Sequence, residues 1–174
     1  MKKILIIVDM QNDFVDGSLG TKEAREIVPR VKKKIEDFDG ELIFTMDTHG
    51  EDYLDTQEGV NLPVVHCVKG TKGHEIIEEL QPYTKKALAI FEKKTFGSKK
   101  LAKFIKALHK EKGIASIELV GLCTDICVVS NALLLKAFVP DVPIVADSSC
   151  CAGVTPESHE SALATMKMCQ IDIK

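Results

Sequence analysis

The chain has 174 residues, of which 45% are hydrophobic and 28% are charged, and its formal net charge is -3. This length is enough for one domain and too short for two ordinary ones, so we expect a single globular domain over residues 1–174. The small net charge, without a basic cluster interleaved with aromatic residues, argues against nucleic acid or an anionic membrane as a partner.

Short apolar runs alternate with longer amphipathic segments along the chain. The apolar runs are rich in Ile, Val, Leu and Phe and are bounded by Gly, Asp or Pro, which is typical of buried strands. We expect strands over Ile4–Val8, Glu41–Met46, Ala87–Phe91, Ser116–Val120, Pro143–Ala146 and Gln170–Ile173, and helices over Glu23–Phe38, Gly73–Leu80, Lys99–Glu111, Asp125–Phe138 and Pro156–Met168. This alternation predicts a three-layer α/β/α fold with a six-stranded, mainly parallel sheet.

The N-terminal run Ile4–Val8 superficially resembles a signal peptide, but Asp9 interrupts it and no small-residue cleavage site follows. No apolar stretch approaches the length needed to span a membrane. The chain contains six cysteines. Without a secretory signal, these cysteines indicate a reducing compartment, so we expect the protein to be cytoplasmic.

Ligands of an open parallel sheet bind beyond the carboxyl ends of its strands, so the polar residues that follow each apolar run are the first candidates for a site. These residues are Asp9, Asp47–His49, Glu92–Lys94, Gly121–Cys127 and Asp147. The same edge therefore gathers acids, a cation, a thiol and a histidine. The longest stretch without clear periodicity, residues 47–73, leaves this edge, and loops of such length are usually functional or disordered.

Cys127 is the first candidate nucleophile. It lies in the first turn of a predicted helix after a glycine-containing loop, with Thr124 as the expected N-cap. A helix N-terminus and Lys93 would both favour its thiolate. One alternative is that Cys127 is a small buried apolar residue. Another is a disulfide or metal pair with Cys123, which the four-residue spacing does not favour.

Asp9 and Lys93 are expected to accompany the thiol. A buried carboxylate is costly unless it is paired, so Asp9 needs a partner such as Lys93, and a purely structural pair stays open as an alternative. Together with Cys127 the pair also makes chemical sense, because the carboxylate can take the thiol proton while the ammonium stabilises the thiolate.

Asp47, His49 and His66 have the side chains of a divalent-metal site, and Glu58 is a candidate fourth ligand. The alternative is a solvated loop with an acid and two surface imidazoles. A helix beginning at Pro156 would also allow His159 to serve as a base. Otherwise we expect the remaining histidines to be structural or solvent-facing: His74, His109 and His159.

Four segments, in this order, resemble the motifs of the isochorismatase-like cysteine hydrolases, and within them the nicotinamidases. They are Ile6–Phe14, Asp47–His49 with His66–Val68, Glu92–Ser98 and Gly121–Val128, and a closing stretch, Asp147–Gly153 followed by His159, is also similar. The resemblance covers nearly the whole chain. It implies that Asp9 is the general acid/base, that Cys127 is the nucleophile, and that Lys93 is the catalytic lysine, with Lys94 as the alternative.

The resemblance further implies a Rossmann-like six-stranded parallel sheet between helices and a cis peptide bond before Cys123. It implies an oxyanion hole made by the backbone N–H groups of Cys123 and Cys127. It also implies a divalent metal in the metal set, with zinc as the first expectation and manganese or iron as alternatives, and a homo-oligomer.

Nicotinamidases commonly place a tryptophan near the segment that matches Leu62–His66, and this chain has no tryptophan. We therefore expect Phe14 and Tyr53 to supply the aromatic surface for a small-molecule amide substrate. The predicted reaction is hydrolysis of nicotinamide, or of a similar small carboxamide, to the acid and ammonia through a thioester. The alternatives are another substrate of the same family, a nucleotide-binding α/β module, or a thiol or metal-binding protein that uses Cys123, Cys127, Cys150 and Cys151.

Overall fold

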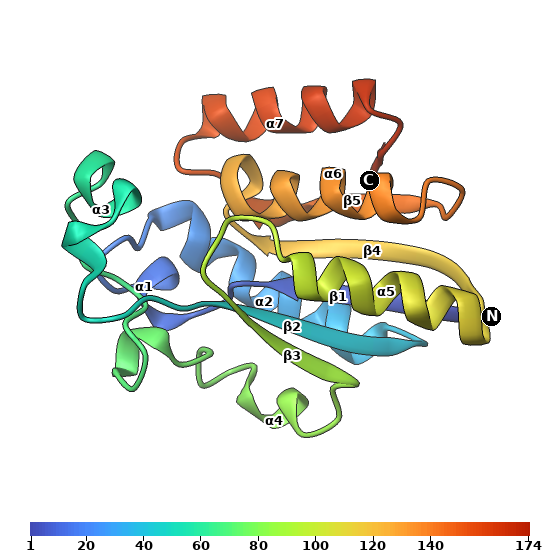
Figure 1. Ribbon diagram of the computed structural model, residues 1–174, viewed down its shortest axis with the longest axis horizontal. Helices are drawn as coiled ribbons and strands as arrows, with labels where there is room; N and C mark the ends of the chain where they lie inside the picture. Colours follow the sequence, from blue (N-terminus) through green and yellow to red (C-terminus); the bar gives the residue numbers. More distant parts are fainter.

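Six parallel strands form one sheet in the order β3-β2-β1-β4-β5-β6 in the computed structural model, which describes residues 1–174 (Figure 1). The strands are β1 (Lys2–Val8), β2 (Glu41–Asp47), β3 (Ala89–Lys93), β4 (Ile114–Leu122), β5 (Ile144–Ala152) and β6 (Asp172–Ile173). The longer helices are α2 (Lys22–Asp37), α5 (Lys99–Lys112), α6 (Val129–Phe138) and α7 (Pro156–Met168). Short helical segments are α1 (Asn12–Val15), η1 (Tyr53–Asp55), α3 (Gln57–Asn61), η2 (Lys72–His74), α4 (Gln81–Thr84) and η3 (Thr124–Val128). The predicted fold class is confirmed.

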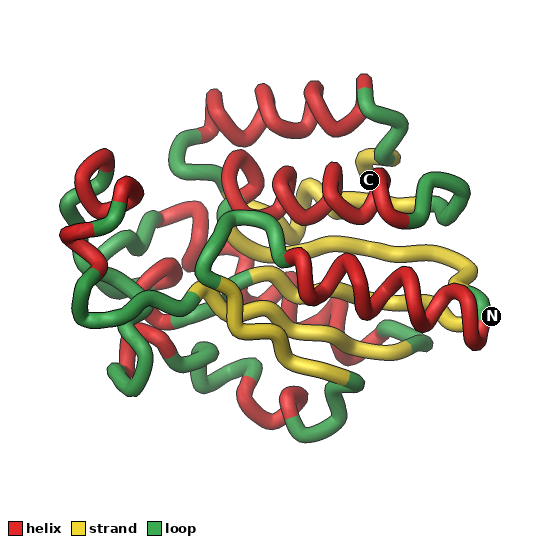
Figure 2. The backbone as a smooth tube through the Cα atoms, in the orientation of Figure 1, coloured by secondary structure: helices red, strands yellow, loops and turns green.

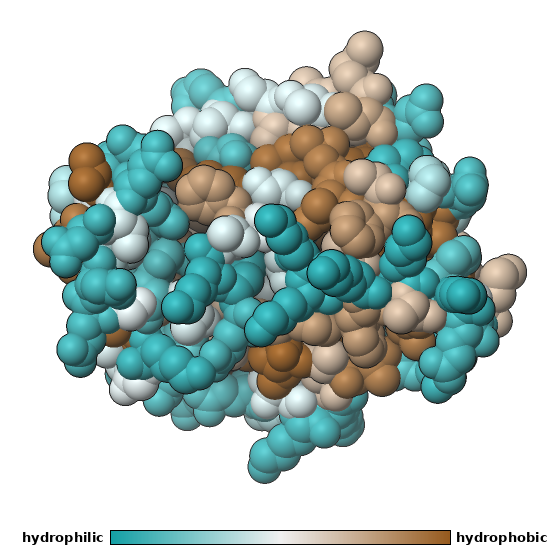
Figure 3. Space-filling model, in the orientation of Figure 1, coloured by the Kyte–Doolittle hydropathy of each residue, from teal (hydrophilic) through white to brown (hydrophobic).

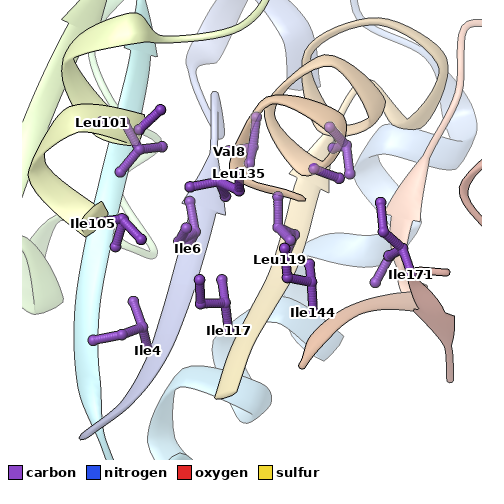
Figure 4. Packing of buried hydrophobic residues seen from close by; sticks show 14 of the residues in the cluster. Ile4, Ile6, Val8, Leu101, Ile105, Ile117, Leu119, Leu135, Ile144 and Ile171 are labelled. Carbon is purple, nitrogen blue, oxygen red and sulfur yellow. The ribbon is translucent and has the colours of Figure 1, made fainter. Parts of the chain in front are cut away.

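The side chains of β1 divide the interior into two apolar layers. Ile4, Ile6 and Val8 pack in a cluster with α5, α6 and α7, whereas Leu5 and Ile7 pack in a second cluster with α1 and α2. Figure 4 shows the first cluster, with side chains of α5 and α6 meeting those of the central strands. All five side chains of Ile4–Val8 are fully buried, because successive residues of a strand point to opposite faces and both faces are covered.

Hydroxyl side chains mark where three of the covering helices begin. Thr21, Ser98 and Thr155 each accept a hydrogen bond from a backbone N–H in the first turn of α2, α5 and α7. Such caps satisfy N–H groups that have no partner within the helix, and each is worth about 1 kcal/mol. The boundaries that periodicity predicted for these three helices agree closely with the structure.

The predicted helix over Gly73–Leu80 is wrong. Only the single turn η2 is helical there, and the chain then runs past the end of β1. The backbone N–H of Asn12 donates to Glu75 O, and that of Ile77 donates to Met10 O, so this backbone pairs with the β1–α1 connection instead of with itself. The apolar spacing that suggested a helix serves to place Ile77 and its neighbours in the second apolar cluster.

The predicted end of the fifth strand at Ala146 is also wrong, because β5 continues to Ala152. Asp147 therefore lies within the strand and not at its carboxyl end. Its carboxylate is 2.6 Å from Lys34 Nζ on α2 and accepts a hydrogen bond from the hydroxyl of Ser149. This ion pair compensates the polar side chain within the strand, and Asp147 takes no part in the edge described below.

The irregular segments that follow β1, β2 and β3 gather at one end of the sheet, opposite the N-terminus (Figure 2). The surface seen in the same orientation is mostly hydrophilic, with apolar side chains concentrated over α6, whose Leu133, Leu134 and Phe138 are only partly buried (Figure 3). None of the helices combines the length and the apolar character that crossing a membrane requires.

Candidate active site

Asp9, Lys93 and Cys127 meet at the carboxyl edge of the sheet. Asp9 follows β1, Lys93 is the last residue of β3, and Cys127 lies in the π-helical turn η3 after β4. Lys93 Nζ lies 2.7 Å from Asp9 Oδ2 and 3.2 Å from Cys127 Sγ. The three residues are 0%, 4% and 4% exposed, whereas Lys94 is exposed. The structure thus brings together the three residues that the sequence singled out, and it places Lys93 rather than Lys94 among them.

The two carboxylate oxygens of Asp9 have different surroundings. Oδ1 accepts a hydrogen bond of 2.6 Å from the hydroxyl of Thr45, a buried residue of β2 that the sequence analysis did not single out. Oδ2 lies close to the Lys93 ammonium but accepts no aligned hydrogen bond, so its lone pairs remain available to a proton donor. Asp9 also has a positive φ of 47°, an uncommon conformation for a residue with a side chain. Such conformations cluster at functional sites.

Burial and charge set the protonation of this trio. Burial raises the pKa of Asp9, and Lys93 only partly opposes this effect. Burial and the Asp9 carboxylate raise the pKa of the Cys127 thiol, again against the effect of Lys93. Burial lowers the pKa of Lys93, but Asp9, Cys127 and Asp47 outweigh it and raise that pKa, so the lysine stays charged. An acid with a raised pKa beside a buried thiol is a stronger proton acceptor than an ordinary aspartate.

The segment that carries the nucleophile differs locally from the prediction. A cis peptide bond joins Leu122 and Cys123, as the resemblance implied. Thr124 is not the N-cap; Cys123 occupies that position, and no side chain caps η3. The hydroxyl of Thr124 instead forms a hydrogen bond of 2.7 Å with Nδ1 of His159. The imidazole of His159 is thereby engaged with Thr124, and no Cys–His pair is formed.

Gly121 allows the segment Gly121–Cys127 to approach Asp9. Its φ is +116°, and a Cβ atom at this position would lie 2.2 Å from the carbonyl oxygen of Val8. Any other residue would therefore both clash and adopt a disfavoured conformation. Glycine lets β1 and β4 come together at the point where Asp9 and the segment leading to Cys127 leave the sheet.

The four predicted metal ligands also converge. Asp47, His49, Glu58 and His66 each offer one ligand atom, and these four atoms all lie within 4.8 Å of one another. Asp47 Oδ2 is 2.9 Å from His49 Nε2 and 3.5 Å from His66 Nε2, and Glu58 Oε1 is 3.6 and 3.7 Å from the same nitrogens. A tetrahedral ion with bonds of about 2.0–2.1 Å separates its ligand atoms by about 3.3 Å, so the set has the size that such an ion requires.

The surroundings of these ligands also fit a divalent cation. Nδ1 of His66 lies 2.8 Å from the carbonyl oxygen of Val64, where a donating N–H fits and leaves Nε2 free to act as a ligand. Burial raises the pKa of Asp47, but hydrogen bonds from His49 and His66 and the charge of Lys93 outweigh this and lower it, so that its carboxylate is charged. Nitrogen and carboxylate oxygen donors of this kind suit zinc and the neighbouring divalent metals.

Gln11, which the sequence analysis did not single out, fixes the backbone of Asp47. Its side chain accepts a hydrogen bond from Asp47 N and donates to Asp47 O and His74 O, at 2.7 to 2.8 Å. Tyr53 packs its ring against His49 and His66 and donates its hydroxyl to Leu62 O. The structure therefore places Tyr53 against the metal ligands. The prediction that Tyr53 supplies an aromatic surface for the substrate is wrong, because Tyr53 does not line the cavity described next.

A cavity of about 350 Å³ connects the thiol with the metal ligands. This volume is within the range of about 300–1,000 Å³ that small-molecule sites occupy. Most of its wall is apolar, which favours a small, largely uncharged ligand. The lining residues that the prediction named are Phe14, Asp47, Glu58, His66, Cys123 and Cys127; those it missed include Leu62, Phe96, Leu122, Ile126 and Val154.

The remaining cysteines do not form a second centre. All six cysteines are free thiols. Cys150 and Cys151 follow each other along β5 and point into different apolar clusters. The only set of metal-binding side chains that converges in the chain is the one without cysteine. This arrangement argues against a thiol-based metal store that would use Cys123, Cys127, Cys150 and Cys151.

Comparisons with known proteins agree with this geometry. Residues 3–173 match the isochorismatase domain family. The nicotinamidase of Schizosaccharomyces pombe is 28% identical, over 97% of this chain and 91% of its own. The pyrazinamidase of Pyrococcus horikoshii in complex with zinc has a TM-score of 0.84 at 28% identity, covering 100% of this chain and 99% of that chain. The nicotinamidase/pyrazinamidase PncA from Bacillus subtilis has a TM-score of 0.79 at 32% identity, covering 99% of each chain. The chain therefore belongs to the isochorismatase family.

Proposed function

We propose that this protein is a cysteine amidohydrolase that converts nicotinamide, or a closely related small carboxamide, to the acid and ammonia. The observation that carries the proposal is the position of the Lys93 ammonium, 2.7 Å from Asp9 Oδ2 and 3.2 Å from Cys127 Sγ, beside a cavity that reaches the metal set. The similarity to nicotinamidases and pyrazinamidases supports the choice of substrate class.

The first half of the reaction forms a thioester. Asp9 accepts the proton of the Cys127 thiol through Oδ2, the oxygen without an aligned hydrogen bond, and Lys93 stabilises the resulting thiolate. The thiolate attacks the carboxamide carbon, and the backbone N–H groups of Cys123 and Cys127 donate to the oxyanion that develops. Asp9 then gives its proton to the amide nitrogen, the C–N bond breaks, and ammonia leaves.

The second half hydrolyses the thioester. Asp9, again a carboxylate, accepts a proton from a water molecule as that water attacks the thioester carbon. The C–S bond breaks, the acid is released, and the sulfur of Cys127 takes the proton back from Asp9. The raised pKa of Asp9 suits both roles, because the group has to accept and return a proton in each half.

We propose that Asp47, His49, His66 and Glu58 hold a divalent metal, with zinc as the first candidate. When bound, the metal would supply a Lewis-acidic position that orients the substrate through a ring nitrogen. Phe14, which lines the same cavity, would pack against the substrate ring. The apolar wall and the fixed distance between the thiol and the metal set then select a flat ring that carries one carboxamide.

The test is ammonia release from a panel of small amides, with nicotinamide first, by zinc-loaded protein. We expect turnover by the native chain and a loss of at least about a thousandfold in Cys127→Ala, with an unchanged circular dichroism spectrum. Cys169→Ala is the matched control, because Cys169 is an exposed free thiol that does not line the cavity. The proposal is wrong if the zinc-loaded native chain releases no ammonia from any amide, or if Cys127→Ala retains turnover.

A further inference from the structure

Asn131 is a buried amide in the mainly apolar helix α6, one turn after Cys127. It is 1% exposed, and an amide at this depth is costly unless its polar atoms are hydrogen-bonded. Its Oδ1 accepts a hydrogen bond of 2.9 Å from the backbone N–H of Ser98. Its Nδ2 donates to Phe96 O at 3.1 Å and to Cys127 O at 2.8 Å. Both donors of the amide are used, and a flipped amide would oppose like groups at all three contacts.

These three hydrogen bonds join two separate parts of the active site. Residues 94–98 connect Lys93, at the end of β3, to the N-cap of α5, and Asn131 holds two of these five residues. The third bond fixes the carbonyl of Cys127 itself. One side chain thus sets the position of the segment that follows the lysine relative to the backbone of the nucleophile.

The contact between this segment and α6 is close. A Cβ atom on Gly97 would lie 3.1 Å from Ser130 O and 3.4 Å from Leu134 Cδ2. Phe96, on the same segment, lines the cavity. A shift of this segment would therefore change both the wall of the cavity and the alignment of the lysine end of β3 with the thiol.

We infer that Asn131 is a positioning residue: by holding residues 96–98 against the Cys127 backbone, it fixes the separation between the Lys93 ammonium and the thiol. This inference rests on the proposed function, because Lys93 and Cys127 take their roles from it. Asn131 lines no part of the cavity and touches no reacting atom, so it acts through the groups that it holds. In Asn131→Ala, the N–H of Ser98 and the C=O of Phe96 lose their partner, and the segment relaxes away from α6.

Two measurements on the zinc-loaded full chain test the inference. The first is the pH midpoint of Cys127 alkylation by iodoacetamide, followed by mass spectrometry of the Cys127 peptide. We expect the midpoint to rise by about one pH unit in Asn131→Ala, because a more distant ammonium stabilises the thiolate less. The second is kcat/KM for nicotinamide, which we expect to fall about 10- to 100-fold, since a displacement near 1 Å can cost about a hundredfold in rate.

The controls separate positioning from general loss of packing. Asn131→Asp keeps the acceptor for Ser98 but turns an oxygen toward the two carbonyls, so it should behave like the alanine variant. Leu135→Ala removes an equally buried side chain from α6 without removing a hydrogen bond, and it should leave both measurements at native values in the folded protein. If the Asn131 variants do not fold, Gly97→Ala tests the same contact, and we expect a change of a few-fold in the same direction.

An alkylation midpoint and kcat/KM that stay native in Asn131→Ala would overturn the inference, and so would equal changes in Leu135→Ala. Inactivity of the native chain toward every amide would sink the proposed function alone. The alkylation midpoints would then still decide whether Asn131 positions the thiol beside Lys93.

Discussion

Replacement of Lys93 by methionine tests the electrostatic basis of the site most directly. Methionine fills a similar volume but removes the charge from the side of Asp9. At an effective dielectric constant of 20, two unit charges 2.7 Å apart attract by about 6 kcal/mol, and burial of both groups consumes much of this. Removing one partner of a buried pair leaves the other charge uncompensated, so we expect Lys93→Met to lower the free energy of unfolding by about 3–5 kcal/mol at pH 7.

The assay is urea unfolding in the presence of a chelator, so that a bound metal does not contribute to the stability of either protein. Lys94→Met is the matched control. Lys94 is the next residue along the chain and its side chain is exposed, so its replacement should change the free energy of unfolding by less than about 0.5 kcal/mol. The pH dependence gives a second check. Without Lys93 the pKa of Asp9, which burial already raises, rises further, so the folded state binds its proton more tightly than the unfolded state.

The variant should therefore gain stability as the pH falls through the folded pKa of Asp9 and lose it as the pH rises. Asp9→Asn in the Lys93→Met background should recover a large part of the loss, because the uncompensated charge is then gone. Equal losses in Lys93→Met and Lys94→Met, or no recovery in the double variant, would refute the reasoning.

Three further changes probe separate features. Gly121→Ala should cost at least about 2 kcal/mol in urea unfolding, because its φ is +116° and its Cβ would meet a carbonyl oxygen of β1; a native midpoint would contradict this. Asp147→Asn should cost about 1.5–3 kcal/mol at pH 7. Burial raises the pKa of Asp147, but the hydrogen bond from Lys34 outweighs this and lowers it, so the difference from the native chain should shrink as the pH falls below about 4; a constant difference would contradict this account. Zinc at 100 times its Kd should stabilise the native chain by about 2.7 kcal/mol, and His66→Ala should abolish this gain in thermal unfolding, whereas His74→Ala, outside the metal set, should keep it.

The position of the catalytic edge followed from the sequence because strand ends are visible in the hydrophobic pattern. Asp9 and Lys93 stand at the point where an apolar run gives way to polar residues. In a parallel sheet all carboxyl ends lie at one edge, so these residues share that edge, and the order β3-β2-β1-β4 keeps their strands close enough for the side chains to meet. Asp147 shows the limit of this reasoning: a strand that continues through polar residues has no visible end, and only its pairing with Lys34 shows why the carboxylate is tolerated there.

The residues that the sequence analysis missed are polar groups within apolar surroundings. Thr45 and Asn131 each lie in a run of hydrophobic residues, and Gln11 lies in the first motif, but their partners are far away in the chain. A polar residue inside a buried strand or helix indicates that some partner exists, and the sequence does not say which one. The π-helical turn η3 was likewise hidden, because it spans a single turn that runs directly into α6 and is too short to show a period of its own.

The order of the strands has a consequence for the synthesis of this chain. β1 occupies an interior position of the sheet, and one of its two neighbours is β4, although β2 and β3 come between them in the chain. While the ribosome is still translating the middle of the protein, β1 has an unpaired edge and its apolar side chains lack the cover of α5 and α6. Exposed strand edges of this kind favour aggregation, and contacts between such distant segments form slowly. The nascent chain thus carries its most apolar strand with one unpaired edge and one incompletely covered face until β4 and α6 have emerged.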